Sequence, residues 1–442
     1  MIESLLVANR GEIARRIIRT ANRLGIRTIA VYSEADADLP FVREASEAVG
    51  IGPANPAQSY RNPDAILAAA KSTAAQAIHP GYGFLSENAD FARTVSASGL
   101  VWVGPGAEAI SAMGDKINAR NLMAAAGVPV APGSQDPAET ADAALAAAAT
   151  IGFPVMVKAA AGGGGMGMSV ANDEAELRKE FEKVRAFAER MFGDGSVLIE
   201  RYFPRVRHVE VQILGLADGR VVALSERECS VQRRNQKLVE EAPSPAVSPE
   251  LRKRLLAAAV KAGEAVDYRN AGTVECLLDP STGEFFFLEM NTRLQVEHPI
   301  TELIHGVDLV EQQLRIASGL EPTLQEGQKG HAIELRINAE DPKRFLPGPG
   351  KVATWVEPAG AGVRVDSGYD EGTTVTPFYD SLMAKLIVFG ADRDDALAKA
   401  RAAVAGFQIA GPKNNLPFFA ELLENEEFLS GDYDTGIVAR MR

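Results

Sequence analysis

The stretch FFFLEMNTRLQVEHP, residues 285–299, concentrates more groups capable of chemistry than any other part of the chain. It begins as an apolar strand, and alternation along an extended backbone predicts that its polar side chains share one face. Those side chains belong to Glu289, Asn291, Arg293, Gln295 and Glu297. A carboxylate and an amide suit Mg²⁺, a guanidinium suits a small planar oxyanion, and a second carboxylate is free to act as a base. The alternative is an edge strand with a solvated polar face, which matching motifs elsewhere in the chain disfavour.

A second candidate is the glycine-rich segment VKAAAGGGGMGMSV, residues 157–170. Its glycines match GxGxxG, but apolar runs on both sides predict a hairpin, whereas a dinucleotide fold needs a helix after the loop. A protein kinase places its lysine after the loop and a Walker A motif needs GK before Ser or Thr, so the pattern disfavours both. We therefore predict a flexible flap whose backbone N–H groups close over phosphates, with Lys158 on the strand leading into it. A merely mobile hairpin is the alternative, disfavoured because so long a glycine run has a large folding entropy cost.

Composition limits the classes of function. The 442 residues, 46% of them hydrophobic, predict two or three domains. A formal net charge of −13 disfavours nucleic acid as a main partner. No apolar run is long enough to span a membrane and the start lacks the order of a signal peptide, so we expect no membrane association and a cytoplasmic location. Cys229 and Cys276 form no CxxC pair, which argues against a zinc cluster or a disulfide framework and favours two buried free thiols.

Short β-branched runs alternate with helical patterns over the first hundred residues, which predicts a parallel, doubly wound α/β sheet. Its first turn, ANRGE, lacks the spaced glycines of a dinucleotide fingerprint, so no NAD site is predicted. We expect a linker helix from Asp115 to Ala126, an alanine-rich surface helix over 141–149 and then an amphipathic helix with one apolar stripe. That stripe comprises Leu177, Phe181, Val184, Ala188 and Met191. From His208 onward the pattern is mostly strand.

A series of motifs runs along the chain: ANRGEIA, IHPGYGFLSEN, MGDK, VKAAAGGGGMGM, ERYF, RHVEVQ, QRRNQKLVEEAPSP, EMNTRLQVEHPITE, RINAED and YDS. In this order they resemble the biotin carboxylases of the ATP-grasp superfamily, and the resemblance covers essentially the whole chain. It implies an α/β and α+β molecule with the ATP-grasp fold: an N-terminal doubly wound parallel sheet, a mobile lid domain with the glycine flap, and a mostly antiparallel C-terminal domain. The implied boundaries are 1–113 for the N-terminal domain, 114–130 for the linker helix, 131–203 for the lid and 204–442 for the catalytic domain.

The resemblance also implies a role for individual residues. Those expected to bind the nucleotide are Lys116, Lys158, Gly164, Gly165, Glu200, Arg201, Tyr202, Phe203, His208 and Asn235. Those expected to hold the metal, Mg²⁺ or Mn²⁺, are Glu275, Glu289 and Asn291. Bicarbonate is assigned to Lys237, Arg293, Gln295 and Val296. The implied catalytic residues are Lys237, Arg293, Glu297 as the base, and Arg336 beside the ureido oxygen of biotin.

The implied reaction consumes ATP in two stages. Bicarbonate, deprotonated by Glu297, attacks the γ-phosphoryl group of ATP to give carboxyphosphate, which releases CO₂ and leaves phosphate beside biotin. The phosphate takes the ureido proton while Arg336 stabilises the developing oxyanion, and the biotin nitrogen attacks CO₂. The string nearest to the biotinylation motif AMKM, LMAKL around Lys385, has the wrong flanks and is interpreted as a structural strand. Biotin is therefore expected on a separate biotin carboxyl carrier protein.

A carboxyltransferase subunit would use the product, which makes this chain one subunit of an acyl-CoA or related carboxylase, such as the acetyl-CoA carboxylase of fatty acid biosynthesis. The resemblance further suggests a homodimer. Three positions depart from the family pattern: Ala161 replaces a glycine, Met166 an Arg or Lys, and Asn235 a His. We interpret these as tuning of ATP affinity or flap closure. Two alternatives stay open: an ATP-grasp ligase that joins a carboxylate to an amine, and a non-catalytic nucleotide sensor.

Overall fold

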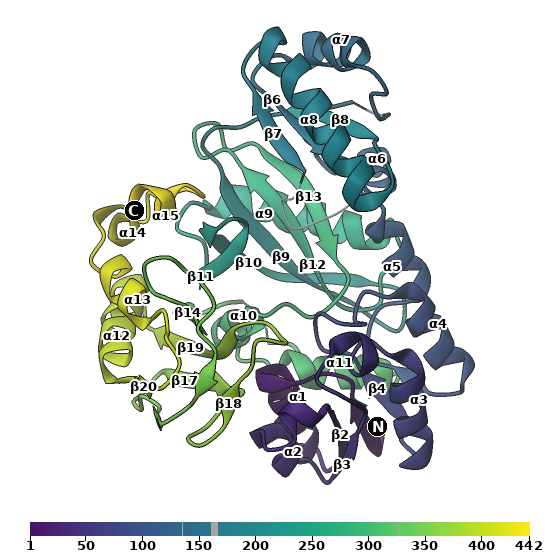
Figure 1. Ribbon diagram of the computed structural model, residues 1–442, viewed down its shortest axis with the longest axis vertical. Helices are drawn as coiled ribbons and strands as arrows, with labels where there is room; N and C mark the ends of the chain where they lie inside the picture. Colours follow the sequence, from purple (N-terminus) through teal and green to yellow (C-terminus); the bar gives the residue numbers. More distant parts are fainter. Residues whose placement is uncertain (135, 161–166, 326) are drawn as a thin grey trace.

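The computed structural model describes residues 1–134, 136–160, 167–325 and 327–442. Its first layer, purple and blue in Figure 1, is a five-stranded parallel sheet in the order β3-β2-β1-β4-β5. The strands are β1 (Ser4–Val7), β2 (Arg27–Tyr32), β3 (Glu47–Gly50), β4 (Ala77–His79) and β5 (Val101–Trp102). The helices between them are α1 (Gly11–Arg23), α2 (Pro40–Glu44), α3 (Pro63–Ser72) and α4 (Ala89–Ala97). The predicted doubly wound parallel sheet is confirmed.

Two consecutive helices lead out of this sheet along one side of the molecule (Figure 1). They are α5 (Ala107–Gly114) and α6 (Lys116–Ala125). The Asp115 side chain caps α6 by accepting hydrogen bonds from the backbone N–H groups of Ile117 and Asn118. The cap fixes Lys116 as the first residue of the predicted linker helix.

A small antiparallel sheet in the order β7-β6-β8 forms the upper end of the molecule in Figure 1. Its elements are β6 (Val155–Ala159), β7 (Met168–Ala171), β8 (Val197–Arg201), α7 (Ala141–Ile151) and α8 (Glu174–Phe192). The pairing of β6 with β7 confirms the predicted hairpin, although residues 161–166 at its tip lie outside the described residues. The apolar stripe of α8 is buried as predicted except for Met191, which is 54% exposed. The prediction for Met191 was wrong because a helix of 19 residues is about 28 Å long and overhangs strands of roughly 17 Å.

An eight-stranded antiparallel sheet crosses the centre of the molecule in the order β13-β12-β9-β10-β11-β14-β19-β17. Its strands are β9 (Arg207–Gly215), β10 (Val221–Arg233), β11 (Gln236–Ala242), β12 (Asn270–Leu278), β13 (Phe285–Asn291), β14 (His331–Asn338), β17 (Val363–Ser367) and β19 (Leu382–Gly390). The helices packed on it are α9 (Pro249–Glu264), α10 (His298–His305), α11 (Leu309–Ala317) and α12 (Arg393–Gly406). The expected strand-rich second half is confirmed.

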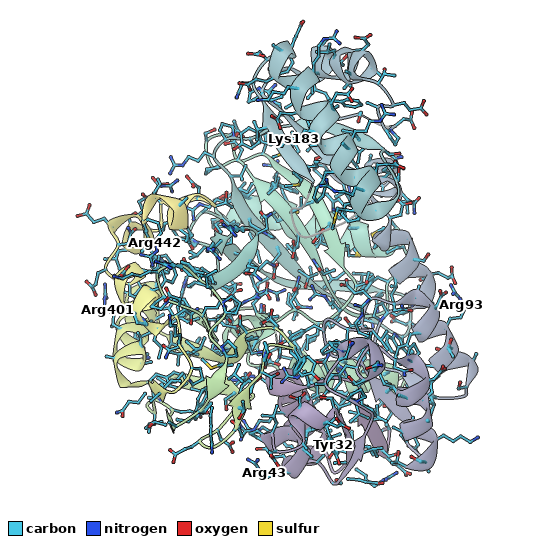
Figure 2. The ribbon with its side chains drawn as sticks, in the orientation of Figure 1. Tyr32, Arg43, Arg93, Lys183, Arg401 and Arg442 are labelled. Atoms are coloured by element: carbon cyan, nitrogen blue, oxygen red, sulfur yellow. The ribbon has the colours of Figure 1, made fainter. Side chains whose placement is uncertain are left out.

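The remaining elements are short and lie toward the C-terminus. They are β15 (Gly350–Lys351), β16 (Thr354–Val356), β18 (Thr374–Val375), β20 (Gln408–Ala410), α13 (Leu416–Leu422), α14 (Glu426–Ser430) and α15 (Ile437–Arg440). The arginines labelled in Figure 2 pair with nearby carboxylates: Arg43 with Asp370, Arg93 with Asp90, Arg401 with Glu424 and Arg442 with Glu421. Within the described ranges, no helix is both long enough and apolar enough to cross a bilayer.

Candidate active site

A cavity of about 990 Å³ lies where the N-terminal sheet, the small sheet and the large sheet meet. The sequence-predicted site residues that line it are Lys116, Lys158, Glu200, Arg201, Tyr202, Phe203, His208, Asn235, Lys237, Glu275, Glu289, Asn291, Arg293, Gln295, Val296 and Arg336. Glu297 is not part of the lining, because it is completely buried beneath Lys237 and Arg336. Gly164 and Gly165, with Ala161 and Met166, lie outside the described residues. Residues far apart in the sequence are thus gathered around one space.

The segment 285–299 reaches this cavity by a different route from the one we predicted. The strand β13 ends at Asn291, and the chain then leaves the sheet before α10 begins at His298. Strand alternation therefore places only Glu289 and Asn291, and the prediction of one continuous extended face was wrong. The side chains after Asn291 converge because irregular backbone turns them inward. One such turn is fixed by Glu87 of the N-terminal layer, whose carboxylate accepts a 3.0 Å hydrogen bond from the backbone N–H of Thr292.

Glu297 is held between two cations. Its Oε1 lies 2.7 Å from Nζ of Lys237, and its Oε2 lies 2.9 Å from Nη2 of Arg336. Burial by itself would raise the pKa of Glu297, but the charges of Lys237 and Arg336 outweigh it and hold that pKa well below the ordinary value. Glu297 is therefore an ionised carboxylate whose proton affinity is set by the two cations.

Lys237 lines the cavity and is the cation that three buried carboxylates share. Its ammonium contacts Glu210 at 2.5 Å, Glu275 at 2.9 Å and Glu297 at 2.7 Å. Burial lowers the pKa of Lys237, but the three carboxylates raise it well above its usual range. Fully buried Arg227 supports this arrangement with a 2.6 Å ion pair from its Nε to the other oxygen of Glu210. Sequence reasoning missed Glu210 and Arg227, although Glu210 lies within the motif RHVEVQ.

Arg293 makes contacts through all three nitrogens of its guanidinium. Its Nε lies 3.0 Å from Glu87, its Nη1 donates to Gln295 at 2.8 Å and its Nη2 donates to Asn291 at 2.8 Å. Gln295 in turn donates to Glu275 at 3.0 Å. Arg293 lines the cavity, and the planar, directional donors of a guanidinium fork are of the kind that recognises a small oxyanion. Glu87, also missed in the sequence, ties this fork to the N-terminal layer.

Three carboxylates form a row across neighbouring strands. Glu210 of β9 lies opposite Glu275 of β12, which lies opposite Glu289 of β13. Lys237 offsets the first two, whereas burial and the charge of Glu275 raise the pKa of Glu289. A divalent cation between Glu275 and Glu289 would remove this excess of negative charge, and carboxylate oxygens suit Mg²⁺. The third predicted ligand, Asn291, already has its oxygen bonded to Arg293 and its buried Nδ2 without a partner in the described part of the chain.

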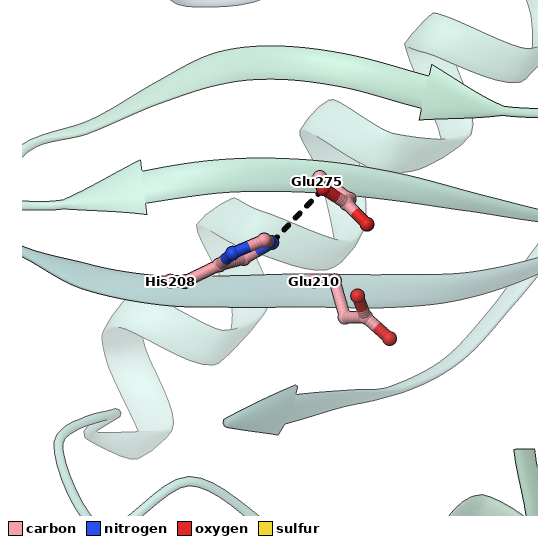
Figure 3. A group of neighbouring side chains, drawn as sticks. All are labelled: His208, Glu210 and Glu275. Atoms are coloured by element: carbon pink, nitrogen blue, oxygen red, sulfur yellow. Dashed lines mark ion pairs between the residues drawn. The ribbon is translucent and has the colours of Figure 1, made fainter. Parts of the chain in front are cut away.

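His208, Glu210 and Glu275 also offer one ligand atom each within 4.8 Å of one another, and Figure 3 shows them on adjacent strands. The ion pair between Nε2 of His208 and Glu275 measures 3.0 Å. Burial lowers the pKa of His208, but the charge of Glu275 outweighs it and raises that pKa. Glu275 also contacts Lys237, but Glu289 makes no ion pair among the described residues, whereas Glu210 is bound by both Lys237 and Arg227. The pair Glu275 and Glu289 therefore fits a metal better than this trio.

The opposite end of the cavity is built for a larger ligand. Lys158 of β6 forms an ion pair with Glu200 of β8, and both line the cavity. The ring of Phe203 stacks on Phe286 with centroids 4.9 Å apart, which gives this end an apolar wall. Asn235 occupies the turn between β10 and β11 with φ of 65°, a left-handed conformation that asparagine tolerates well. Cationic, apolar and amide groups together suit a nucleotide.

Known proteins match the whole chain. Residues 1–110 match the biotin carboxylase N-terminal domain, residues 115–325 the ATP binding domain of the carbamoyl-phosphate synthase L chain, and residues 334–440 the biotin carboxylase C-terminal domain. Biotin carboxylase 1 of Bacillus subtilis is 49% identical over 98% of both chains. A pyruvate carboxylase subunit of Methanothermobacter thermautotrophicus is 49% identical over all of this chain and 90% of that protein.

A solved structure agrees with this relationship. The biotin carboxylase domain dimer of Hydrogenobacter thermophilus 2-oxoglutarate carboxylase, in complex with MgADP, ADP and bicarbonate, superposes with a TM-score of 0.93. The two sequences are 42% identical, and the match covers 100% of this chain and 98% of that one. The expected fold, with its parallel N-terminal sheet and antiparallel later sheets, is therefore confirmed.

Proposed function

The chain belongs to the biotin carboxylase family of ATP-dependent ligases, and we propose that it uses bicarbonate to carboxylate the biotin of a separate carrier protein. The observation that carries this proposal is the convergence of Lys237 and Arg336 on Glu297, with Arg293 lining the same cavity as these two cations. A base, two cations and an oxyanion fork are what deprotonation and orientation of bicarbonate require. An amine-accepting ligase or a nucleotide sensor has no need for this combination.

Bicarbonate would bind among Lys237, Arg293, Gln295 and the backbone of Val296. The charge of Lys237 would then be shared between bicarbonate and Glu297. Lys237 would stabilise ionised Glu297 less, so the pKa of Glu297 would rise and Glu297 would become a stronger base. Glu297 then takes the proton, and the resulting dianion attacks the γ-phosphoryl group of ATP. The products of this step are ADP and carboxyphosphate, and proton transfer by a positioned side chain contributes roughly 10²–10⁴-fold to such steps.

ATP would lie at the nucleotide end of the cavity. We assign its phosphates to Lys116 and Lys158 and to the backbone of Gly164 and Gly165, and its adenine and ribose to a further group of residues. That group is Glu200, Arg201, Tyr202, Phe203, His208 and Asn235. Mg²⁺, held by Glu275, Glu289 and Asn291, would neutralise charge on the phosphates when bound.

The second stage would transfer CO₂ to biotin. Carboxyphosphate yields CO₂ and phosphate, the phosphate takes the ureido proton, and the freed nitrogen attacks CO₂. Arg336 lines the cavity, and we assign to it the stabilisation of the negative charge that develops on the ureido oxygen. This stage asks the protein mainly to exclude water and to keep Arg336 charged.

Carboxylated biotin must then pass to a carboxyltransferase. We propose that this chain serves an acyl-CoA carboxylase, with a biotin carboxyl carrier protein and a carboxyltransferase as partners. A keto-acid acceptor is the second candidate, favoured by the similarity to the pyruvate and 2-oxoglutarate carboxylases. Reconstitution with the carriers and carboxyltransferases of each class, scored by fixation of labelled bicarbonate into each acceptor, separates the two candidates.

The wider organisation is also proposed. The domains would be residues 1–113, 131–203 and 204–442, with 114–130 as the linker. The 2-oxoglutarate carboxylase relative is a dimer, which supports a homodimer for this chain. A cytoplasmic location is supported by Cys229 and Cys276, which are both buried free thiols.

The test is phosphate release from MgATP, with and without bicarbonate and with and without free biotin. We expect release that needs bicarbonate, rises with biotin and is lost in Glu297→Gln while that variant still binds ATP. The matched control is Glu311→Gln, which removes a carboxylate paired with Arg23 on the surface and should leave release unchanged. Phosphate release that does not change when bicarbonate or biotin is added would refute the proposal.

A further inference from the structure

Two glutamates outside the assigned site face each other beneath α10. Glu240 of β11 lies directly opposite Glu334 of β14 in the antiparallel ladder, so their side chains share one face of the sheet. Both are completely buried. On the same face of the sheet, Ala242, Ala332 and Ile387 pack in one apolar cluster with Ile300 and Ile304 of α10. Water is therefore excluded from this pair of carboxyl groups.

The pair has little compensation. Among the described residues, the only cation in an ion pair with it is Arg336, whose Nη2 lies 2.5 Å from Oε1 of Glu240 and 2.9 Å from Oε2 of Glu297, while Lys385 and Lys237 contribute positive charge without an ion pair. Apart from that shared ion pair, none of the four oxygens of Glu240 and Glu334 has a hydrogen-bond partner in the described ranges. Two ionised carboxylates in this setting would repel each other without donors to stabilise them.

The neighbouring residue on the same strand shows the contrast. Glu241 points to the opposite face, where His331, Arg393 and Tyr433 all contact its carboxylate. Burial opposes ionisation of Glu241, but these partners outweigh it and lower its pKa to about 2. Burial instead raises the pKa of Glu240 to about 7, and it raises that of Glu334 well above its usual range.

We propose that Glu240 and Glu334 hold one proton between them in the resting enzyme, and that this proton keeps Arg336 available to incoming anions and to biotin. The pair acts through Arg336 and is therefore a positioning pair. The charged or titratable groups around it are Arg336, Lys237, Glu297, Lys385, Cys229 and His298. The inference rests on the proposed function, because Arg336 is assigned there to biotin.

A pH dependence follows. When hydroxide removes the shared proton, the pair carries two negative charges instead of one, and the charge of Arg336 then balances that of Glu240. The bicarbonate site next to Arg336 becomes more negative, so bicarbonate binds less tightly as the pH rises. Linkage limits this loss to about tenfold per pH unit above the pKa of the pair.

The kinetic test is the KM for bicarbonate from pH 6.5 to 9 in the wild type, Glu240→Gln and Glu241→Gln. Glutamine is neutral and matches protonated glutamate in shape. The KM of Glu240→Gln for bicarbonate should therefore keep the value that it has at neutral pH over the whole range. The wild type should lose affinity by up to tenfold per pH unit, and Glu241→Gln, the matched control from the same strand, should follow the wild type. A KM that is raised equally at every pH in Glu240→Gln would overturn the proposal, because Glu240 would then be the ionised counter-ion of Arg336.

Infrared spectroscopy tests the proton without catalysis. The resting wild type at pH 6.5 should show a carbonyl band of a protonated carboxyl group that the double variant Glu240→Gln, Glu334→Gln lacks and that disappears in alkali. No such difference would refute the shared proton, and a band with a pH-independent KM would refute its link to Arg336. The infrared band does not depend on catalysis. If phosphate release shows that the proposed function is wrong but the band is present, the protonated carboxyl group is still confirmed, so the failure of one claim can be told from the failure of the other.

Discussion

Replacing Glu241 by glutamine should destabilise the folded protein by about 3 kcal/mol at neutral pH. The Glu241 carboxylate lies 2.6 Å from Nε2 of His331, 2.7 Å from Nε of Arg393 and 2.5 Å from the hydroxyl of Tyr433. Burial raises its pKa, but these partners lower the pKa from 4.5 to about 2. At roughly 1.4 kcal/mol per pH unit, that difference corresponds to about 3 kcal/mol of stability.

The sign of the pH dependence is fixed by the lowered pKa. A carboxylate whose pKa falls on folding contributes its full stabilisation above the unfolded value near 4.5 and loses it as the pH falls toward 2. The difference in unfolding free energy between the wild type and Glu241→Gln should therefore be constant above about pH 5. It should shrink to about half near pH 3.

Urea unfolding at pH 7 and near pH 3 measures this difference. The control is Glu421→Gln, whose carboxylate is 54% exposed and pairs with Arg442 at 2.8 Å, so it should cost no more than about 1 kcal/mol. Equal unfolding free energies for Glu241→Gln and the wild type at pH 7, or a difference that does not shrink in acid, would refute the reasoning.

Three further predictions concern single residues. Arg293→Lys cannot reproduce the fork that includes Glu87, so the loss of one charge-assisted hydrogen bond should raise the KM for bicarbonate about 10- to 100-fold while the KM for ATP stays constant; equal changes in both constants would contradict this. Lys385→Met removes the cation 3.0 Å from buried Glu12, so thermal unfolding should show a loss of roughly 3–5 kcal/mol, and mass spectrometry of the wild type should find no biotin on Lys385. Met166→Arg restores a cation expected near the phosphates and should change the KM for ATP more than turnover in steady-state assays; a large change in turnover alone would count against it.

Much of the fold and the candidate site follows from local sequence. The strand and helix rhythm before Trp102 predicts a parallel sheet, because β-branched runs separated by helical patterns need crossover connections. The apolar runs that flank the glycine-rich segment predict a hairpin with Lys158 on its first strand, and β6 pairs with β7 accordingly. Lys385 was interpreted as a structural lysine, and it is completely buried in β19 with ion pairs to Glu12 and Asp366. Backbone propensities and motif spacing decide these features, and both can be read along the chain.

The tertiary structure decided the electrostatics. Strand alternation accounts for the positions of Glu289 and Asn291. Glu297 contacts Lys237 only because the chain leaves the sheet after Asn291 and places Glu297 at the start of α10. In the same way, the pattern KLVEEA does not reveal that Glu240 meets another glutamate. Strand register and sheet order depend on residues about a hundred positions apart, and a buried charge takes its pKa from those distant neighbours. The sequence by itself therefore determined which chemical groups the protein has, and only the folded chain determined which of them are charged.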